Sequence, residues 1–400
     1  MQPVTIKIQG NFYDSQIYRG KLYLWHFDGR LSVYDWDQLI RNMPTDEYLS
    51  YVKELCFLDG SYLYHYDWFG RLLEDREINN LLKDKITKLT KKQFFVSKEE
   101  LAKVVIKEYD VPLGEMPLDT HIYNKKLYYT VDEGQFVSQL QGLREPISAM
   151  KRPNKIFDGR VVHMAVNNGR MAMSMLSDGL WERELSDFVH FHNNEIQLVV
   201  DSHSNFAYYN YSNIFNSSLV GDSFLVYNSL DDNTMMRQLK YERRVIDRRK
   251  SFYYGEENIT GRKNGSIGWG FNDRIYYSNG KSISAVKFTG YNKDNYFHVL
   301  KDNISINEAP DEQIINAAVA YFGNIVEYMS KLIVLQSDGG VFEVSEPITR
   351  WRVFPRSLNY ENHLHVILDD CLCVCGFMHD YTSNDRNKTM GAYYSNRNNY

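Results

Sequence analysis

A short two-stranded unit recurs along this chain, and the recurrence limits the folds that the sequence can adopt. Its first copy, KLYLWHFDGRLSVYDW over residues 21–36, places Asp28-Gly29 between two runs of alternating apolar residues. An Asp-Gly pair in that position predicts a β-hairpin, because a type I′ turn needs positive φ at both central residues. Similar units turn near residues 29, 70, 134, 179, 233, 280 and 339.

The spacing of these turns predicts how the units are assembled. From first to last they cover 310 residues in six steps, or about 52 residues per step. Kelch blades have roughly 50 residues and WD40 blades about 40–45. A third candidate strand precedes most hairpins, for example at 161–166. The pattern therefore predicts antiparallel units of about four strands, each packing on its neighbours in the chain.

This organisation resembles the β-propeller superfamily over nearly the whole chain. The resemblance is architectural, since neither the Trp-Asp dipeptide of WD40 repeats nor the kelch double glycine recurs. It implies an all-β fold, a single propeller over 1–400 with seven antiparallel four-stranded blades. The strand at 4–8 has no partner nearby in the sequence, so we expect it to join C-terminal strands in one sheet. That sheet is either a shared seventh blade or an eighth.

The longest interval, between the second and third turns, predicts a helical insertion. Apolar residues recur at helical spacing over 77–91. Ser97 and Glu100 then form the pattern of a capping box, which predicts a second helix over 98–108. We therefore expect a helical insertion over 77–108, between the second and third blades.

The composition restricts the classes of function. A net charge of −5 over 400 residues argues against a general nucleic-acid-binding protein. No apolar run is long enough for a membrane span, and the first residues lack the basic and apolar parts of a signal peptide. Four cysteines are too few for a disulfide framework. We therefore expect a cytoplasmic protein without membrane contact, and a flexible tail over 382–400.

Cysteines and histidines near the C-terminus have the composition of a metal site: His363, His365, Cys371, Cys373, Cys375 and His379. If Asp369-Asp370 is a turn, side-chain alternation places the three cysteines on one face of the hairpin and His363 and His365 on the other. A zinc site needs ligands that converge tetrahedrally. The sequence therefore favours a buried core here, and we expect no metal and no cofactor.

Three features are candidates for partner binding. Residues 237–263 hold nine basic and four acidic residues, a local charge of +5 that suits phosphate groups or an acidic protein, although a solvated strand edge has the same composition. The insertion carries lysines opposite its apolar stripe. Two tryptophans flank turns and are expected to be exposed. The candidate binding residues are Arg243, Arg244, Arg248, Arg249, Lys250, Lys83, Lys88, Trp68 and Trp181.

No motif for catalysis stands out, such as a nucleophile elbow, a phosphate-binding glycine loop or a zinc-knuckle spacing. The leading hypothesis is a non-catalytic protein-interaction scaffold or recognition subunit of a larger complex, which docks a partner through rim loops and the insertion. The alternative is a hydrolytic enzyme that acts on carbohydrate or another small substrate in the channel with paired carboxylates. A further alternative is salt-dependent nucleic-acid binding through 237–263.

Overall fold

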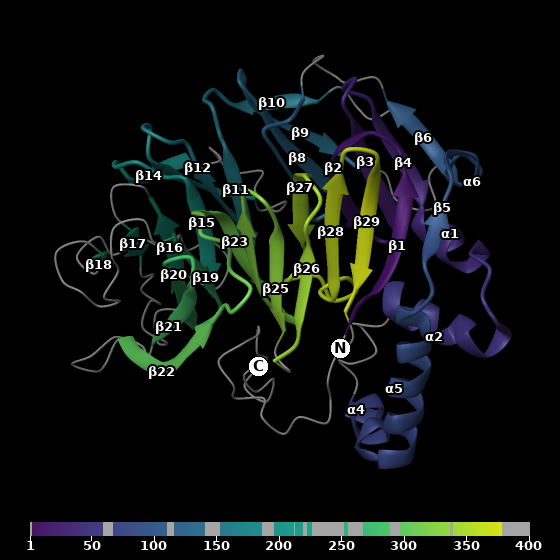
Figure 1. Ribbon diagram of the computed structural model, residues 1–400. Coiled ribbons are helices and arrows are strands. Elements are labelled where there is room, and N and C mark those ends of the chain that lie inside the picture. The colour runs from purple at the N-terminus through teal and green to yellow at the C-terminus, as the bar shows by residue number, and fades with distance from the viewer. Residues whose placement is uncertain are drawn as a thin grey trace, which may run out of the picture. The chain divides into compact units, whose positions relative to one another are not determined.

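The computed structural model has seven sheets among its described residues, and all seven contain four antiparallel strands (Figure 1). In five of the seven sheets, strands that follow one another along the chain are neighbours. This is the architecture of a seven-bladed β-propeller, as the repeat predicted. The structure describes residues 2–58, 67–109, 116–140, 153–185, 196–211, 213–218, 222–225, 252–254, 267–288, 297–336 and 339–377.

The chain forms two compact units, and the first contains three sheets. One sheet comprises β2 (Phe12–Tyr18), β3 (Lys21–His26), β4 (Leu31–Asp35) and β6 (Val105–Tyr109). The next comprises β23 (Ile314–Ala320), β24 (Gly323–Tyr328), β25 (Leu332–Gln336) and β26 (Val341–Val344). The terminal sheet comprises β27 (Ile348–Val353), β28 (His363–Leu368), β29 (Cys371–Gly376), β1 (Val4–Gln9) and the additional strand β5 (Phe94–Val96).

The second unit contains four sheets. They comprise β7 (Asp119–Tyr123), β8 (Lys126–Val131), β9 (Gly134–Gln139) and β10 (Asn154–Phe157); β11 (His163–Asn167), β12 (Arg170–Ser174), β13 (Leu180–Glu184) and β14 (Ile196–Val200); β15 (Phe206–Asn210), β16 (Asn213–Ser217), β17 (Asp222–Leu225) and β18 (Phe252–Tyr254); and β19 (Ile267–Phe271), β20 (Arg274–Ser278), β21 (Ser282–Phe288) and β22 (Phe297–Ser305). The predicted turn at 233 lies outside the described residues.

The two ends of the chain meet in the terminal sheet, as expected (Figure 1). β1 pairs antiparallel with β29, from Val4 opposite Gly376 to Gln9 opposite Cys371. The pairing removes two free sheet edges at once, because β1 has no partner near it in sequence and β29 ends the described chain. The terminal segments therefore form the shared seventh blade rather than an eighth.

The hairpin predicted around residue 70 was wrong. Residues Asp67–Glu74 form a helix, α4, in which Leu73 is buried and Trp68 and Leu72 are exposed. A run of apolar residues as short as this one fits either a strand or a helix, and the side-chain period alone does not separate them. The propeller keeps seven blades because the terminal sheet supplies the blade that this hairpin was expected to form.

The helical insertion is larger than predicted and lies within one blade, between β4 and β6. It comprises α1 (Trp36–Asn42), α2 (Glu47–Phe57), α4, α5 (Arg76–Thr90), β5 and α6 (Lys98–Ala102). The helix predicted over 77–91 is present as α5, and the capping box of Ser97 and Glu100 is formed. The second helix, however, ends at Ala102, and β6 pairs with β4 instead of continuing it. The tail over 382–400 lies outside the described residues.

The first hairpin has a different turn from the one predicted. Gly29 adopts a φ of 86°, whereas Asp28 is not among the residues with positive φ. The amide of Gly29 donates to the carbonyl of His26, and the amide of His26 donates to the carbonyl of Arg30. This is a three-residue loop with a glycine bulge rather than a type I′ turn. The Asp28 carboxylate stabilises the turn, because it accepts hydrogen bonds from the backbone amide and from Nε of Arg30.

Candidate interaction surface

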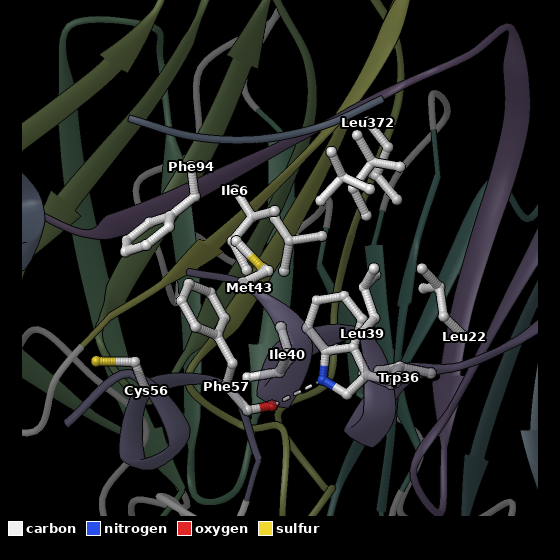
Figure 2. Close-up of a cluster of buried hydrophobic side chains, with 14 of the residues drawn as sticks. Ile6, Leu22, Trp36, Leu39, Ile40, Met43, Cys56, Phe57, Phe94 and Leu372 are labelled. Carbon is white, nitrogen blue, oxygen red and sulfur yellow. Dashed lines mark hydrogen bonds between the residues drawn. The ribbon is translucent and has the colours of Figure 1, made fainter. Parts of the chain in front are cut away.

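The insertion is fixed to its parent blades by a shared apolar core (Figure 2). Trp36 is fully buried, and its Nε1 donates a hydrogen bond of 2.8 Å to the carbonyl oxygen of Phe57 at the end of α2. Asn362 donates from Nδ2 to the carbonyl of Cys56 at 2.9 Å. β5 adds a parallel strand to β1. The inner side of the insertion is therefore part of the same buried core as the blades on which it lies.

The outer side of the insertion is unusually apolar. Eight of the fourteen large apolar side chains that are exposed among the described residues lie between residues 48 and 105. Clustered exposed apolar groups mark interaction sites more often than scattered ones do. α2 and α4 both pack on α5. Six of the eight belong to these three helices and are called here the helical face: Tyr48, Tyr51, Trp68, Leu72, Ile78 and Leu81.

The part of the helical face around α5 is positively charged, whereas α2 and α4 each carry a formal charge of −1. Residues 76–92, which contain α5, hold six basic and two acidic residues, a formal charge of +4. The ammonium group of Lys85 lies 5.8 Å from the ring centroid of Tyr48, which joins this charge to the aromatic part of the face. Lys88 pairs with Asp84 at 2.7 Å, and hydrogen bonding from Lys88 lowers the pKa of the Asp84 carboxyl. An apolar and acidic partner surface would complement this arrangement.

The structure separates the residues that were selected from the sequence. Trp68, Lys83 and Lys88 all lie on α4 and α5. Trp181 is half-buried on β13, where it packs near Phe157 and donates from Nε1 to the carbonyl of Asp178. It therefore does not form an exposed pair with Trp68, which is 55% exposed. The five basic residues Arg243, Arg244, Arg248, Arg249 and Lys250 lie outside the described residues.

The C-terminal cysteines belong to a hydrophobic core, as the predicted register required. Val366 is opposite Cys373, and Leu364 is opposite Cys375. Cys371, Cys373 and Cys375 are buried in one apolar cluster with these residues. Within the described part of the chain, no three His, Cys, Asp or Glu side chains are arranged to hold a metal ion. None of the described helices is long and apolar enough to cross a membrane.

Two buried histidines on β28 lie beside the insertion and make stability depend on pH. His363 is fully buried among Trp36, Phe57 and Tyr360, with ring centroids 5.3–6.1 Å away. Burial lowers its pKa to about 3. Burial also lowers the pKa of His365 well below its usual value. Both imidazoles are therefore neutral in the folded protein at neutral pH.

Acidification is expected to destabilise the fold through His363. The unfolded chain binds a proton at this residue below about pH 6.5, whereas the folded protein does so only near pH 3, so stability falls as the pH falls between these values. Each such group contributes a slope of up to about 1.4 kcal/mol per pH unit. His363→Phe, measured by denaturant unfolding at several pH values, is expected to reduce the slope. An unchanged slope would contradict this assignment.

A buried cluster of charged side chains on β2 and β27 could not be predicted from the sequence. Asp14 on β2 is fully buried and accepts hydrogen bonds from Arg350 at 2.9 Å and from Arg352 at 2.6 and 2.7 Å. Both arginines are on β27 and are 22% and 16% exposed. Because Asp14 and Arg350 are more than three hundred residues apart, only the meeting of the chain ends brings them together. The cluster links the terminal blade to the blade of β2.

Comparison with known proteins supports the fold. No family model matches the sequence, and no curated protein matches it by sequence. Among solved structures, the β-propeller domain of Cps50 (Swd1) from Myceliophteria thermophila has a TM-score of 0.52 and 9% sequence identity, covering 94% of this chain and 100% of that one. The computationally designed Ika8 protein has a TM-score of 0.43 and 7% identity over the same shares. At such identities the similarity concerns the fold alone.

Proposed function

We propose that this protein is a non-catalytic interaction scaffold, a subunit of a larger complex that docks a partner protein through the helical face. The observation that carries the proposal is the concentration of exposed apolar side chains on α2, α4 and α5. A propeller is a rigid platform on which insertions vary without disturbing the blades. The partner surface is expected to be apolar with acidic residues around it, because residues 76–92 carry a charge of +4.

The helices that carry the helical face are also anchored in the core, and this supports a docking role for their exposed side. The same helices that expose the helical face bury Leu49, Ile86 and Leu89 against the blades. A helix that packs one apolar side on the blades and exposes a second apolar side can bury that second side against another surface. Trp and Tyr are also the residues that contribute most to binding at protein interfaces, together with Arg. The helical face contains one tryptophan and two tyrosines.

The triple variant Trp68→Ala, Leu72→Ala and Leu81→Ala tests the proposal. Tagged wild-type protein and the variant are purified from the native host with nuclease treatment, and the proteins bound to each are quantified by mass spectrometry. Recovery of the partner is expected to fall at least about tenfold, because each buried anchor residue contributes substantially to binding. The fold is expected to be retained, since all three side chains are at least 40% exposed.

A matched control removes three exposed apolar side chains outside the insertion, with Ile315→Ala, Met329→Ala and Leu358→Ala. This control is expected to recover the partner as wild-type protein does. Equal recovery by both triple variants would place the docking surface elsewhere and overturn the proposal for the helical face. Wild-type protein that carries no stoichiometric partner would contradict the scaffold function itself.

A further inference from the structure

A cavity of about 740 Å³ lies beside α6 and shares no residue with the helical face. It is bounded by the β1–β2 connection, the β3–β4 turn, α6 and β6. The volume is within the roughly 300–1,000 Å³ that is typical of ligand pockets. Its floor is apolar, since Phe12, Tyr34 and Leu101 line it and are no more than 5% exposed. We call this space the α6 cavity.

Exposed apolar side chains continue from the floor of the α6 cavity to its mouth. Phe27 in the β3–β4 turn is 48% exposed, and Val105 at the start of β6 is 42% exposed. An apolar floor that opens between two exposed apolar side chains can bury a large apolar group of a ligand. The site therefore favours an aromatic or branched aliphatic group.

The α6 cavity is lined in part by the edge strand of its sheet. β6 is the last strand in the order β2-β3-β4-β6, and in the described part of the chain it pairs only with β4 (Figure 1). Tyr34 is opposite Val105, and both line the cavity together with Glu108. A strand added along β6 would direct alternate side chains onto this same face. Addition to an edge strand is a common mode of peptide recognition.

Polar groups on one wall of the α6 cavity are already held in place. The Ser32 hydroxyl contacts the Nε2 atom of His26 at 2.9 Å and donates to Glu108 at 3.4 Å. Burial lowers the pKa of His26, so this imidazole is neutral at neutral pH. Arg30 pairs with Asp28 at 2.8 Å and lies 3.8 Å from Glu108. Asp28 and Glu108 together with Arg30 leave this wall a formal charge of −1.

Lys98 differs from the other charged residues of the cavity. It is exposed at the start of α6, lines the cavity, and makes no ion pair with another described residue. An acidic group on the ligand would therefore gain a partner here without displacing an existing one. The cavity combines an apolar floor, an edge strand and one available cation.

We propose that the α6 cavity and the outer edge of β6 bind an extended peptide segment of a partner. The peptide backbone pairs with β6, a large apolar side chain enters the cavity, and an acidic residue two positions along the peptide, on the same face, lies opposite Lys98. This inference is independent of the helical face, so either proposal can fail without the other. The chemistry recognised is an extended, apolar and acidic motif rather than a folded surface.

The test uses short fluorescein-labelled peptides of alternating threonine and valine, with Phe-Thr-Asp, Ser-Thr-Asp or Phe-Thr-Lys at the centre. They are called here the Phe-Asp, Ser-Asp and Phe-Lys peptides, and the central threonine places the two variable side chains on one face. Fluorescence polarisation with the full chain is expected to show saturable binding of the Phe-Asp peptide. Removing the phenyl group in the Ser-Asp peptide is expected to weaken binding at least about tenfold, because a buried aromatic side chain is lost. Ala102→Trp, which fills the mouth from an exposed position of α6, is expected to cause a similar loss.

Two charge-reversal variants, one on α6 and one at its C-cap, test whether Lys98 selects the acidic residue of the peptide. Lys98→Glu is expected to reverse the preference between the Phe-Asp and Phe-Lys peptides, whereas Lys103→Glu, which lies outside the cavity lining, keeps it. The helical-face triple variant is expected to bind the Phe-Asp peptide as wild-type protein does. Absence of wild-type binding up to about 1 mM, or unchanged binding to Ala102→Trp, would overturn the proposal. Equal reversal by Lys103→Glu would overturn the role of Lys98.

Discussion

Trp36→Ala is expected to lower the free energy of unfolding by about 3–5 kcal/mol. The side chain is fully buried in the core that joins the insertion to its parent blades (Figure 2). Its removal leaves a cavity between α1 and Phe57, whose ring centroid lies 6.3 Å away, and also removes the hydrogen bond to the Phe57 carbonyl. Denaturant unfolding followed by circular dichroism measures the change without depending on tryptophan fluorescence.

Two further variants separate packing from hydrogen bonding at this position. Trp36→Phe keeps most of the apolar volume but leaves the carbonyl of Phe57 without its indole donor, and it is expected to cost about 1–3 kcal/mol. Trp68→Ala removes a tryptophan that is 55% exposed and is expected to change stability by less than about 0.5 kcal/mol. A cost for Trp36→Ala no larger than that for Trp68→Ala would refute the role assigned to this core.

Asp14→Ala is the second substitution with a large expected effect, a loss of about 3–5 kcal/mol. The carboxylate is fully buried and is the shared acceptor of Arg350 and Arg352, so its removal takes charge-assisted hydrogen bonds from two partly buried guanidinium groups. Much of the loss comes from weaker compensation of these partly buried charges rather than from the strength of the ion pair itself. The measurement is again the midpoint of denaturant unfolding.

A solvent-exposed pair provides the comparison for Asp14. Asp132 accepts from Arg160 at 2.7 Å, a similar distance, but the two side chains are 69% and 56% exposed. Asp132→Ala is therefore expected to cost no more than about 1 kcal/mol, because water screens the interaction. If Asp14→Ala and Asp132→Ala had equal effects, burial would not be the factor that makes the Asp14 cluster important.

The local pattern of the chain was sufficient for five of the seven predicted hairpins and for part of the insertion. Alternating apolar residues on either side of a turn specify a hairpin wherever one face is buried, and this information lies within about twenty residues. The same is true of α5, whose apolar spacing and capping residue are local. The cysteine face was also predictable, because side chains two residues apart on a strand share a face.

The candidate site could be predicted only in part. The lysines of α5 follow from features of the sequence. Trp68 is exposed, but on a helix rather than beside the turn on which the expectation rested. The exposure of Leu72 and Leu81 had no sequence signal, since both belong to apolar patterns that are usually buried. The half-buried position of Trp181 depends on Phe157, a residue of another sheet. The α6 cavity is formed by segments that are brought together from residues 9–34 and 98–108.

Pairing between segments that are distant in the sequence explains the structural features that the side-chain pattern could not predict. Residues 67–74 were expected to form the turn and returning strand of a hairpin but form α4, which packs on α5. Residues 105–109 leave the predicted helix and complete the blade of β4. The Asp14 cluster exists because β1 and β29 pair across the whole chain and bring β27 beside β2. Hairpins and helical faces arise from neighbours in sequence, and the periodicity of side chains reports them directly. Contacts of the chain ends and of inserted segments depend on which distant surfaces pack together, and local side-chain periodicity does not contain that information.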